Sequence, residues 1–256
     1  MLGAPCRIGV LGLLVIPMSD AHAQPHRDRT PDGPATPDAL VAHHAKLTVT
    51  KTVDMSYLLY LPDGYKDDRS RRWPLVVFLH GAGERGDDLN KVKLHGPPRY
   101  IAKGTSYPFI LLAPQCPEKR WWDADVILAL LDRVAAAYRV DPDRVYLTGL
   151  SMGGFGTWEA AATAPRRFAA IVPICGGGDP ATAPKLVHTP IWAFHGADDP
   201  VVPVARSRRM VDAVQAAGGD AKLTVYPDTG HDSWTRTYED PRVFDWLLAH
   251  KRSTDR

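Results

Sequence analysis

The sequence lacks a dominant charge. It carries 31 lysine and arginine residues against 29 aspartate and glutamate residues, which gives a formal net charge of +2 at pH 7. Proteins that bind nucleic acid or an anionic membrane surface through charge normally gather a large basic excess on one face. Here the basic residues are scattered along the chain. We therefore expect neither nucleic acid nor a charged membrane surface among the partners of this protein.

Cysteines and metal-ligand patterns are also scarce. The chain has 3 cysteines, of which Cys6 lies near the N-terminus and Cys116 and Cys175 lie in the main part of the sequence. No group of His, Cys, Asp or Glu residues shows the short spacings that are typical of a metal site. The sequence therefore predicts no metal and no other cofactor.

The apolar run near the N-terminus is too short to span a bilayer. Residues 8–18 give about eleven residues, whereas a membrane helix needs about twenty. Arg7 precedes this run, and Ala21-x-Ala23 follows it. This order is typical of a secretory signal peptide, here over residues 1–23. Cleavage after Ala23 would leave a periplasmic or secreted protein with no membrane span.

The remaining chain divides into a linker and one domain. Residues 24–38 hold four prolines and few apolar residues, which is typical of a flexible Pro-rich linker. Residues 39–256 suit one compact α/β domain, with a mostly parallel sheet of about eight strands and helices on both faces. The first two strands are expected to form an antiparallel pair. The expected strands are 47–50, 57–60, 75–79, 109–113, 144–148, 170–174, 191–195 and 222–226, and the main helices are 125–138, 155–164, 204–217 and 241–250.

A G-x-S-x-G pattern lies between an expected strand and the helix that follows it. Its fixed positions are Gly149, Ser151 and Gly153. A sharp strand-to-helix turn of this kind holds the serine in a strained conformation with its hydroxyl exposed, and the flanking glycines remove side chains that would clash. The pattern predicts that Ser151 is a nucleophile. The alternative is an ordinary glycine-rich loop.

A serine nucleophile on such a turn needs an acid and then a histidine further along the chain. Asp198 and Asp199 follow the expected strand 191–195. We expect Asp199 to be the acid because it directly precedes Pro-Val-Val-Pro, as in esterases with an H-G-x-x-D-x-x-V-P loop, which leaves Asp198 as a solvated residue or a helix cap. His231 follows the last strand and is the expected base. It would accept the serine proton while the aspartate fixes its tautomer.

An oxyanion hole is expected after the strand at 75–79. The sequence there continues His80-Gly-Ala-Gly, where a backbone N–H can join the N–H of the residue after the nucleophile. Ala82 and Met152 are the expected donors, with Gly83 as the alternative to Ala82. His80 is expected to brace the loop. The charged residues that follow suit loop salt bridges better than a metal site: Glu84, Arg85, Asp87 and Asp88.

With these motifs the chain resembles the serine esterases of the α/β-hydrolase superfamily. More narrowly, it resembles the secreted polyhydroxybutyrate-depolymerase and feruloyl-esterase-like group and related small esterases labelled predicted peptidases. The resemblance implies an α/β-hydrolase fold and hydrolase chemistry, but not one substrate, since this fold and triad act on many esters. Dienelactone hydrolases differ in having a cysteine nucleophile. The matching stretches are residues 60–65, 80–88, 95–98, 113–117, 148–154, 174–179, the Asp199 loop and Gly230-His231.

The resemblance also bears on the cysteines and on the cover of the site. The strand order usual in this group separates the strands ahead of Cys116 and Cys175, and a disulfide needs Cα atoms within about 7 Å. We therefore expect free thiols, and neither cysteine occupies a nucleophile position. Only residues 175–189 lie where other members of the superfamily insert a cap. The resemblance thus implies an open site without a cap domain.

Three side chains are candidates to line the substrate site: His95, Trp122 and Trp234, with loop packing as the alternative for the two tryptophans. The prediction is an exported serine hydrolase that cleaves small-molecule or polymeric carboxylic esters, in particular bulky or aromatic ones, through an acyl-enzyme. The alternative is a serine peptidase of the prolyl-oligopeptidase type acting on small peptides, although those relatives carry a propeller that this sequence lacks. The sequence makes no prediction of oligomeric state.

Overall fold

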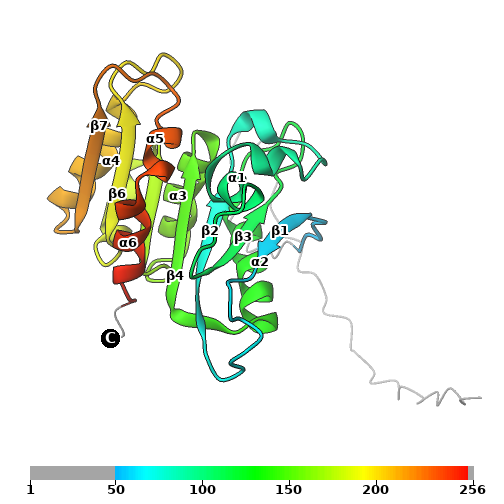
Figure 1. Cartoon of the computed structure of the whole chain (residues 1–256). Coiled ribbons are helices and arrows are strands. Elements are labelled where there is room, and N and C mark those ends of the chain that lie inside the picture. The colour runs from blue at the N-terminus through cyan, green and yellow to red at the C-terminus, as the bar shows by residue number, and fades with distance from the viewer. Residues whose placement is uncertain (1–49, 253–256) are drawn as a thin grey trace, which may run out of the picture. The chain divides into compact units, whose positions relative to one another are not determined.

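The computed structural model of the protein describes residues 50–252. The predicted signal peptide, the predicted linker and most of the expected strand 47–50 lie outside the described residues, and Thr50 itself lies in a loop. In the described part the strands form one sheet of seven, in the order β1-β3-β2-β4-β5-β6-β7 (Figure 1). The prediction of a mostly parallel α/β sheet is confirmed.

The first strand lies at one edge of the sheet and is the antiparallel one. It pairs with β3, and the other neighbouring strands are parallel to each other. The expected pairing of this strand with residues 47–50 falls almost wholly outside the described residues. The carboxyl ends of the parallel strands therefore meet at one edge, where loops can bring distant residues together. The strands are β1 Tyr57–Tyr60, β2 Trp73–Leu79, β3 Ile110–Pro114, β4 Val140–Leu150, β5 Ala170–Ile174, β6 Ile191–Gly196 and β7 Ala221–Tyr226.

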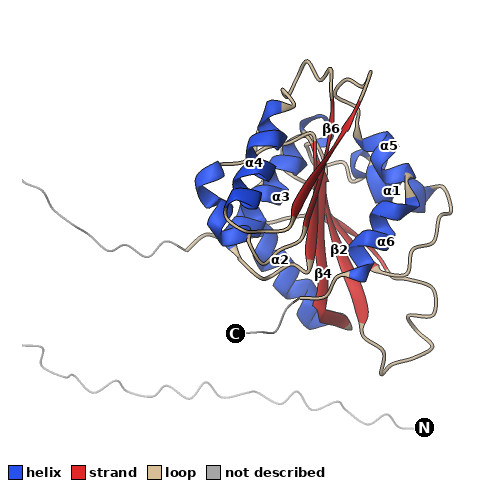
Figure 2. Ribbon diagram, turned by 90° about the vertical axis from the view of Figure 1, so that its left-hand side faces the viewer, coloured by secondary structure: helices blue, strands red, loops and turns tan. Residues whose placement is uncertain are grey.

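Helices cover both faces of the sheet. Figure 2 shows α2, α3 and α4 on one face and α1, α5 and α6 on the other. The short helices α1 and α5 were not expected from the sequence. Their formation depends on packing against each other and against the sheet more than on any strong helical pattern. The bounds are α1 Gly96–Ala102, α2 Ala124–Ala137, α3 Met152–Thr163, α4 Ala205–Ala216, α5 Trp234–Glu239 and α6 Pro241–Ala249.

The strand β2 shows why the sheet is covered on both sides. All its residues are buried, which is typical of a central parallel strand. Successive side chains point to opposite faces, so that Leu75 and Val77 join the core beneath α2, α3 and α4, whereas Val76 and Phe78 join the core beneath α1, α5 and α6. The sheet is thereby fixed between two hydrophobic layers, and the loops at its carboxyl edge have a rigid base.

No cap covers that edge between β5 and β6. The connection contains only the 3-10 helix Pro180–Leu186, as the sequence predicts. Among residues 50–252, no helix has both the length and the apolar character needed to cross a membrane.

The start of α3 lies very close to the end of β2. A Cβ atom added to Gly153 would lie 2.0 Å from the carbonyl oxygen of Leu79, and one added to Gly149 would lie 2.4 Å from the carbonyl oxygen of Gly153. Backbone atoms cannot move aside as a flexible side chain can. Glycine is therefore required at both positions for the helix to begin where it does.

Gly153→Ala should destabilise the protein, because the added methyl group would push α3 away from β2. We expect a loss of about 2 kcal/mol or more in the free energy of unfolding, in the range seen for overpacked cores, measured by urea denaturation. Gly83→Ala is the matched control, since an added Cβ there meets nothing within 4 Å. Equal stability of the two variants would contradict the close packing described here.

Candidate active site

Ser151 occupies the turn between β4 and α3. Its backbone has φ 52° and ψ −116°, a conformation that an ordinary residue rarely adopts and that costs about 1–3 kcal/mol. Its N–H donates to the carbonyl oxygen of Ile174 at 2.9 Å, which fixes the turn against β5. The strained serine at the tip of a strand–turn–helix unit is the geometry of a nucleophile elbow.

The three residues singled out for catalysis lie in one hydrogen-bonded line. His231 Nε2 lies 2.9 Å from Ser151 Oγ, and His231 Nδ1 lies 2.7 Å from Asp199 Oδ2. The serine follows β4, the aspartate follows β6 and the histidine follows β7. Such a line can move a proton from a serine hydroxyl to an imidazole that a carboxylate orients.

Asp199, and not its neighbour Asp198, is the carboxylate in this line. The side chain of Asp199 has no exposed surface, and its Oδ1 accepts the N–H groups of Val201 and Val202 at 2.9 Å each. Burial alone would raise the pKa of the Asp199 carboxyl, but the hydrogen bonds from His231, Val202 and Val201 outweigh it and lower the pKa. Asp198 is exposed.

The loop after β2 lies against the serine and offers free N–H groups. Ala82 is the first residue of the 3-10 helix Ala82–Glu84, and Met152 is the first residue of α3. The first N–H groups of a helix have no acceptor within the helix. An added Cβ at Gly81 would lie 3.7 Å from Ser151 Cβ, so this loop runs directly beside the serine, as the expected donor pair requires.

Buried contacts brace the loop after β2. His80 Nδ1 lies 2.7 Å from the Gly81 carbonyl oxygen, and His80 Nε2 accepts the N–H of Cys116 at 3.0 Å. Trp122 Nε1 donates to the His80 carbonyl oxygen at 3.0 Å. Trp122 was a candidate to line the substrate site, but it is only 5% exposed. Its burial favours bracing over substrate contact, whereas the neighbouring Trp121 is 63% exposed.

The other two lining candidates, His95 and Trp234, contact each other. Trp234 Nε1 donates to His95 Nδ1 at 3.3 Å, and His95 Nε2 lies 3.5 Å from Glu84 Oε1. The Trp234 ring also packs edge-on against the His231 ring, with centroids 5.3 Å apart. A chain of contacts therefore links the base to the loop that carries Ala82. Glu84 was expected to form a salt bridge within its own loop, but no motif in the sequence predicts its contact with His95.

Both cysteines in the described part are free and buried. Cys175, Asp199 and His231 offer ligand atoms that lie within 4.8 Å of one another, so they could in principle hold a metal ion. However, Asp199 and His231 already bond to each other, and burial raises the pKa of the Cys175 thiol strongly, whereas a metal needs the thiolate. We therefore interpret the group as part of the serine site.

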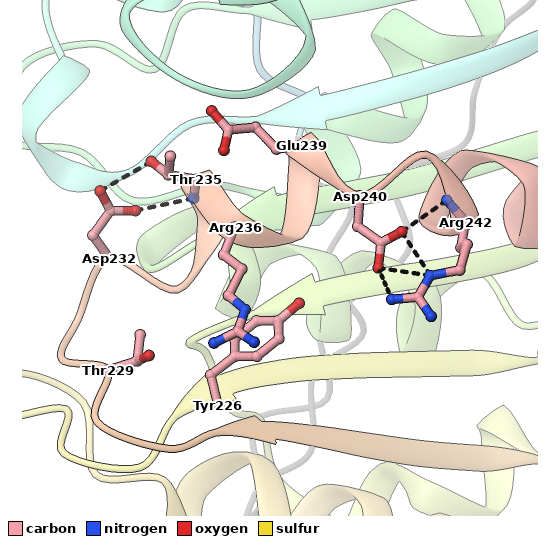
Figure 3. A pocket seen from close by; sticks show the side chains of 8 residues that line it. All are labelled: Tyr226, Thr229, Asp232, Thr235, Arg236, Glu239, Asp240 and Arg242. Carbon is pink, nitrogen blue, oxygen red and sulfur yellow. Dashed lines mark hydrogen bonds and ion pairs between the residues drawn. The ribbon is translucent and has the colours of Figure 1, made fainter.

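A surface cavity of about 620 Å³ lies beside the loop that carries His231. Figure 3 shows the Arg236 guanidinium over the Tyr226 ring, 4.5 Å from its centroid, and the ion pair of Asp240 with Arg242. Ser151, Asp199 and His231 do not line it. The lining residues are Tyr226, Thr229, Asp232, Thr235, Arg236, Glu239, Asp240 and Arg242.

Comparison with known proteins identifies the family of this chain. Residues 41–243 match the family model for the dienelactone hydrolase family. A probable feruloyl esterase C of Aspergillus terreus is 25% identical over 187 residues, which cover 71% of this chain and 68% of that protein. Poly(3-hydroxyalkanoate) depolymerase C of Paucimonas lemoignei is 32% identical over 121 residues, which cover 41% of this chain and 28% of the depolymerase. This chain thus spans less than a third of the depolymerase.

The solved structures that are similar to this chain include a thermostable esterase. The two are 37% identical with a TM-score of 0.69, and the match covers 78% of this chain and 60% of the esterase chain. The acylaminoacyl peptidase of Pyrococcus horikoshii shares the fold at a TM-score of 0.59, but its 14% identity carries nothing further.

The fold, the family model and the similar esterase structure together identify the chain as an α/β-hydrolase. The chain belongs to the dienelactone hydrolase family, although a serine stands at its elbow.

Asp199→Asn should be far more damaging to activity than Asp198→Asn. The amide would favour the wrong tautomer of His231 and could cost up to about 10⁴-fold in kcat, whereas the exposed Asp198 should matter by less than about 3-fold. Steady-state hydrolysis of p-nitrophenyl acetate by the two variants measures this difference. The opposite ranking would assign the acid to Asp198.

The free energy of unfolding should fall as the pH falls from 7 to 5. Burial lowers the pKa of His80 to about 4, and burial also lowers the pKa of His195. Histidine in the unfolded chain titrates near 6.5, so in this window the unfolded chain binds protons that the folded chain does not. We expect a loss of at least about 2 kcal/mol in urea unfolding. Constant stability across this range would contradict the burial of neutral histidines.

Proposed function

We propose that this protein is an exported serine hydrolase that cleaves carboxylic esters through an acyl-enzyme on Ser151. The observation that carries the proposal is the hydrogen-bonded line from Ser151 through His231 to Asp199. Export is supported by the sequence of residues 1–23, which is typical of a signal peptide.

In the proposed reaction Ser151 Oγ attacks the ester carbonyl carbon while His231 Nε2 accepts its proton. The negative charge that develops on the carbonyl oxygen is met by the N–H groups of Ala82 and Met152. His231 then gives its proton to the departing alcohol oxygen, which leaves the acyl group on the serine. A water molecule then attacks the acyl carbon in the same way, with His231 as the base, and the carboxylic acid product leaves Ser151. Asp199 holds the imidazole and stabilises its charged form throughout.

We further propose bulky, aromatic or polymeric esters as substrates. Two observations support this substrate class. No cap covers the carboxyl edge of the sheet between β5 and β6, and Trp121 presents a largely exposed ring that packs edge-on against Phe155, one helical turn from the serine. An exposed indole can stack on an aromatic ring or a sugar. The relatives named feruloyl esterase and polyhydroxyalkanoate depolymerase are consistent with such substrates.

A peptidase is the alternative, since the same triad can cleave amides. The peptidase likeness rests on the fold alone, whereas the relatives with higher identity are esterases. Parallel assays on p-nitrophenyl acetate and on peptide anilides separate the two functions. A screen over acetyl-xylan, feruloyl esters and short-chain polyesters then tests the substrate class. Faster turnover of the anilides would reject the esterase proposal.

Ser151→Ala should fold normally and lose at least roughly 10⁴-fold in kcat, because the nucleophile is gone while the oxyanion hole and the binding site remain. The measurement is hydrolysis of p-nitrophenyl acetate, with thermal unfolding as the check on folding. A fluorophosphonate should label the wild type at this residue and leave the variant unlabelled. A variant that kept a tenth of the activity would remove Ser151 as the nucleophile.

A further inference from the structure

A second histidine lies against the acid of the triad. His195, near the end of β6, is fully buried, and the proposed reaction does not use it. Its Nε2 lies 3.2 Å from Asp199 Oδ2, the same oxygen that contacts His231 Nδ1 at 2.7 Å. One carboxylate oxygen thus faces two imidazole rings.

The same histidine also binds the far end of the acid loop. His195 Nε2 lies 2.8 Å from the carbonyl oxygen of Val202, while the N–H of Val202 donates to Asp199 Oδ1 at 2.9 Å. His195 Nδ1 lies 2.7 Å from Ser207 Oγ on α4. The ring therefore ties the end of β6, the acid loop and α4 together.

The neighbours of His195 determine where its proton lies. Nε2 faces the Val202 carbonyl oxygen and the Asp199 carboxylate, and neither group can donate while the carboxylate is ionised. Nε2 must therefore carry a hydrogen. Nδ1 faces the Ser207 hydroxyl at 2.7 Å, and the single hydrogen of that hydroxyl can go either to Nδ1 or to the Gly176 carbonyl oxygen, which lies 3.0 Å from Ser207 Oγ. The Nε2–H is thus required whether the ring is neutral or charged.

We propose that His195 is a positioning residue, which through its Nε2–H holds the acid loop closed on Val202 and shares Asp199 Oδ2 with His231. This inference rests on the proposed function, since it assigns a partner to the proposed acid. Two consequences follow. The carboxylate cannot turn away from His231, and the partial positive charge of the second N–H weakens the pull of Asp199 on the proton of His231.

Few other ionisable groups face this cluster in the described structure. Cys175 directly follows β5 and lies next to this cluster. Burial raises the pKa of its thiol, which keeps the thiol neutral. Asp232 follows His231 and is exposed. On α4, Arg206 precedes Ser207 and its Cβ lies against Gly177. Burial lowers the pKa of His195 itself, which favours the neutral ring, and the neutral ring still acts through its Nε2–H.

Substitution of His195 tests the proposal. His195→Leu removes the N–H and should lower kcat roughly 10- to 100-fold with little change in KM, because a small displacement of the acid is enough for such a loss. The acidic midpoint of the kcat/KM profile should move up by roughly half a pH unit, since Asp199 would then hold the His231 proton more strongly. His195→Gln keeps an N–H donor and should regain most of kcat and the wild-type midpoint.

His250→Leu is the matched control. It also removes one imidazole, but His250 follows α6 and its Nδ1 contacts the carbonyl oxygen of Trp246, away from the triad. Its activity and pH profile should stay those of the wild type. If His195→Leu and His195→Gln lowered kcat equally and left the acidic midpoint of the kcat/KM profile unmoved, the role of His195 would be merely structural. That result would overturn the proposal. An unchanged kcat in His195→Leu would do the same.

A measurement that leaves His195 in place keeps the proposal testable even if His195→Leu does not fold. In ¹⁵N-labelled protein, NMR should show a proton on Nε2 of His195 that shifts in Asp199→Asn. A proton on Nδ1 alone would overturn the inference. Failure of the proposed function can be distinguished from failure of this inference. An active Ser151→Ala variant would reject the proposed triad, whereas the NMR result for His195 would be unaffected.

Discussion

The close approach of α3 to β2 is the contact on which the rest of the site depends. With no side chain at Gly149 or Gly153, the first turn of the helix lies directly on the carbonyl oxygen of Leu79. This contact places Ser151 beside the loop that follows β2, and so it sets the distance between the serine and the N–H of Ala82. A wider gap would separate the two halves of the proposed oxyanion hole, whatever side chains the loops carried.

The parallel sheet brings the other two members of the proposed triad to the same place. Asp199 and His231 follow β6 and β7, and each loop is anchored by backbone contacts: Asp198 N–H donates to the Thr229 carbonyl oxygen at 3.0 Å. The acid loop and the base loop are therefore held to each other as well as to the sheet. The geometry of the proposed triad therefore depends first on the strand order, and the side chains complete it.

The difference between strand order and contacts of distant side chains explains what could be predicted from the sequence. The alternation of strands and helices and the order of Ser151, Asp199 and His231 are local patterns, and the structure brings the three together as expected. The bracing role of Trp122 depends on its packing against Gly156 in α3, where an added Cβ would lie 2.8 Å from Trp122 Cβ. Such contacts between distant segments leave no period or motif. For the same reason the sequence predicted His195 only as part of a buried strand, and not as a neighbour of Asp199.

The uncovered edge between β5 and β6 has a consequence for the fate of the acyl group. With only the 3-10 helix Pro180–Leu186 in that connection, no cap inserted at this point shields the proposed acyl-enzyme from solvent. Water that enters along this edge can accept the acyl group, which fits the proposed hydrolysis. A cover inserted at the same point would exclude water and would favour transfer of the acyl group to another alcohol.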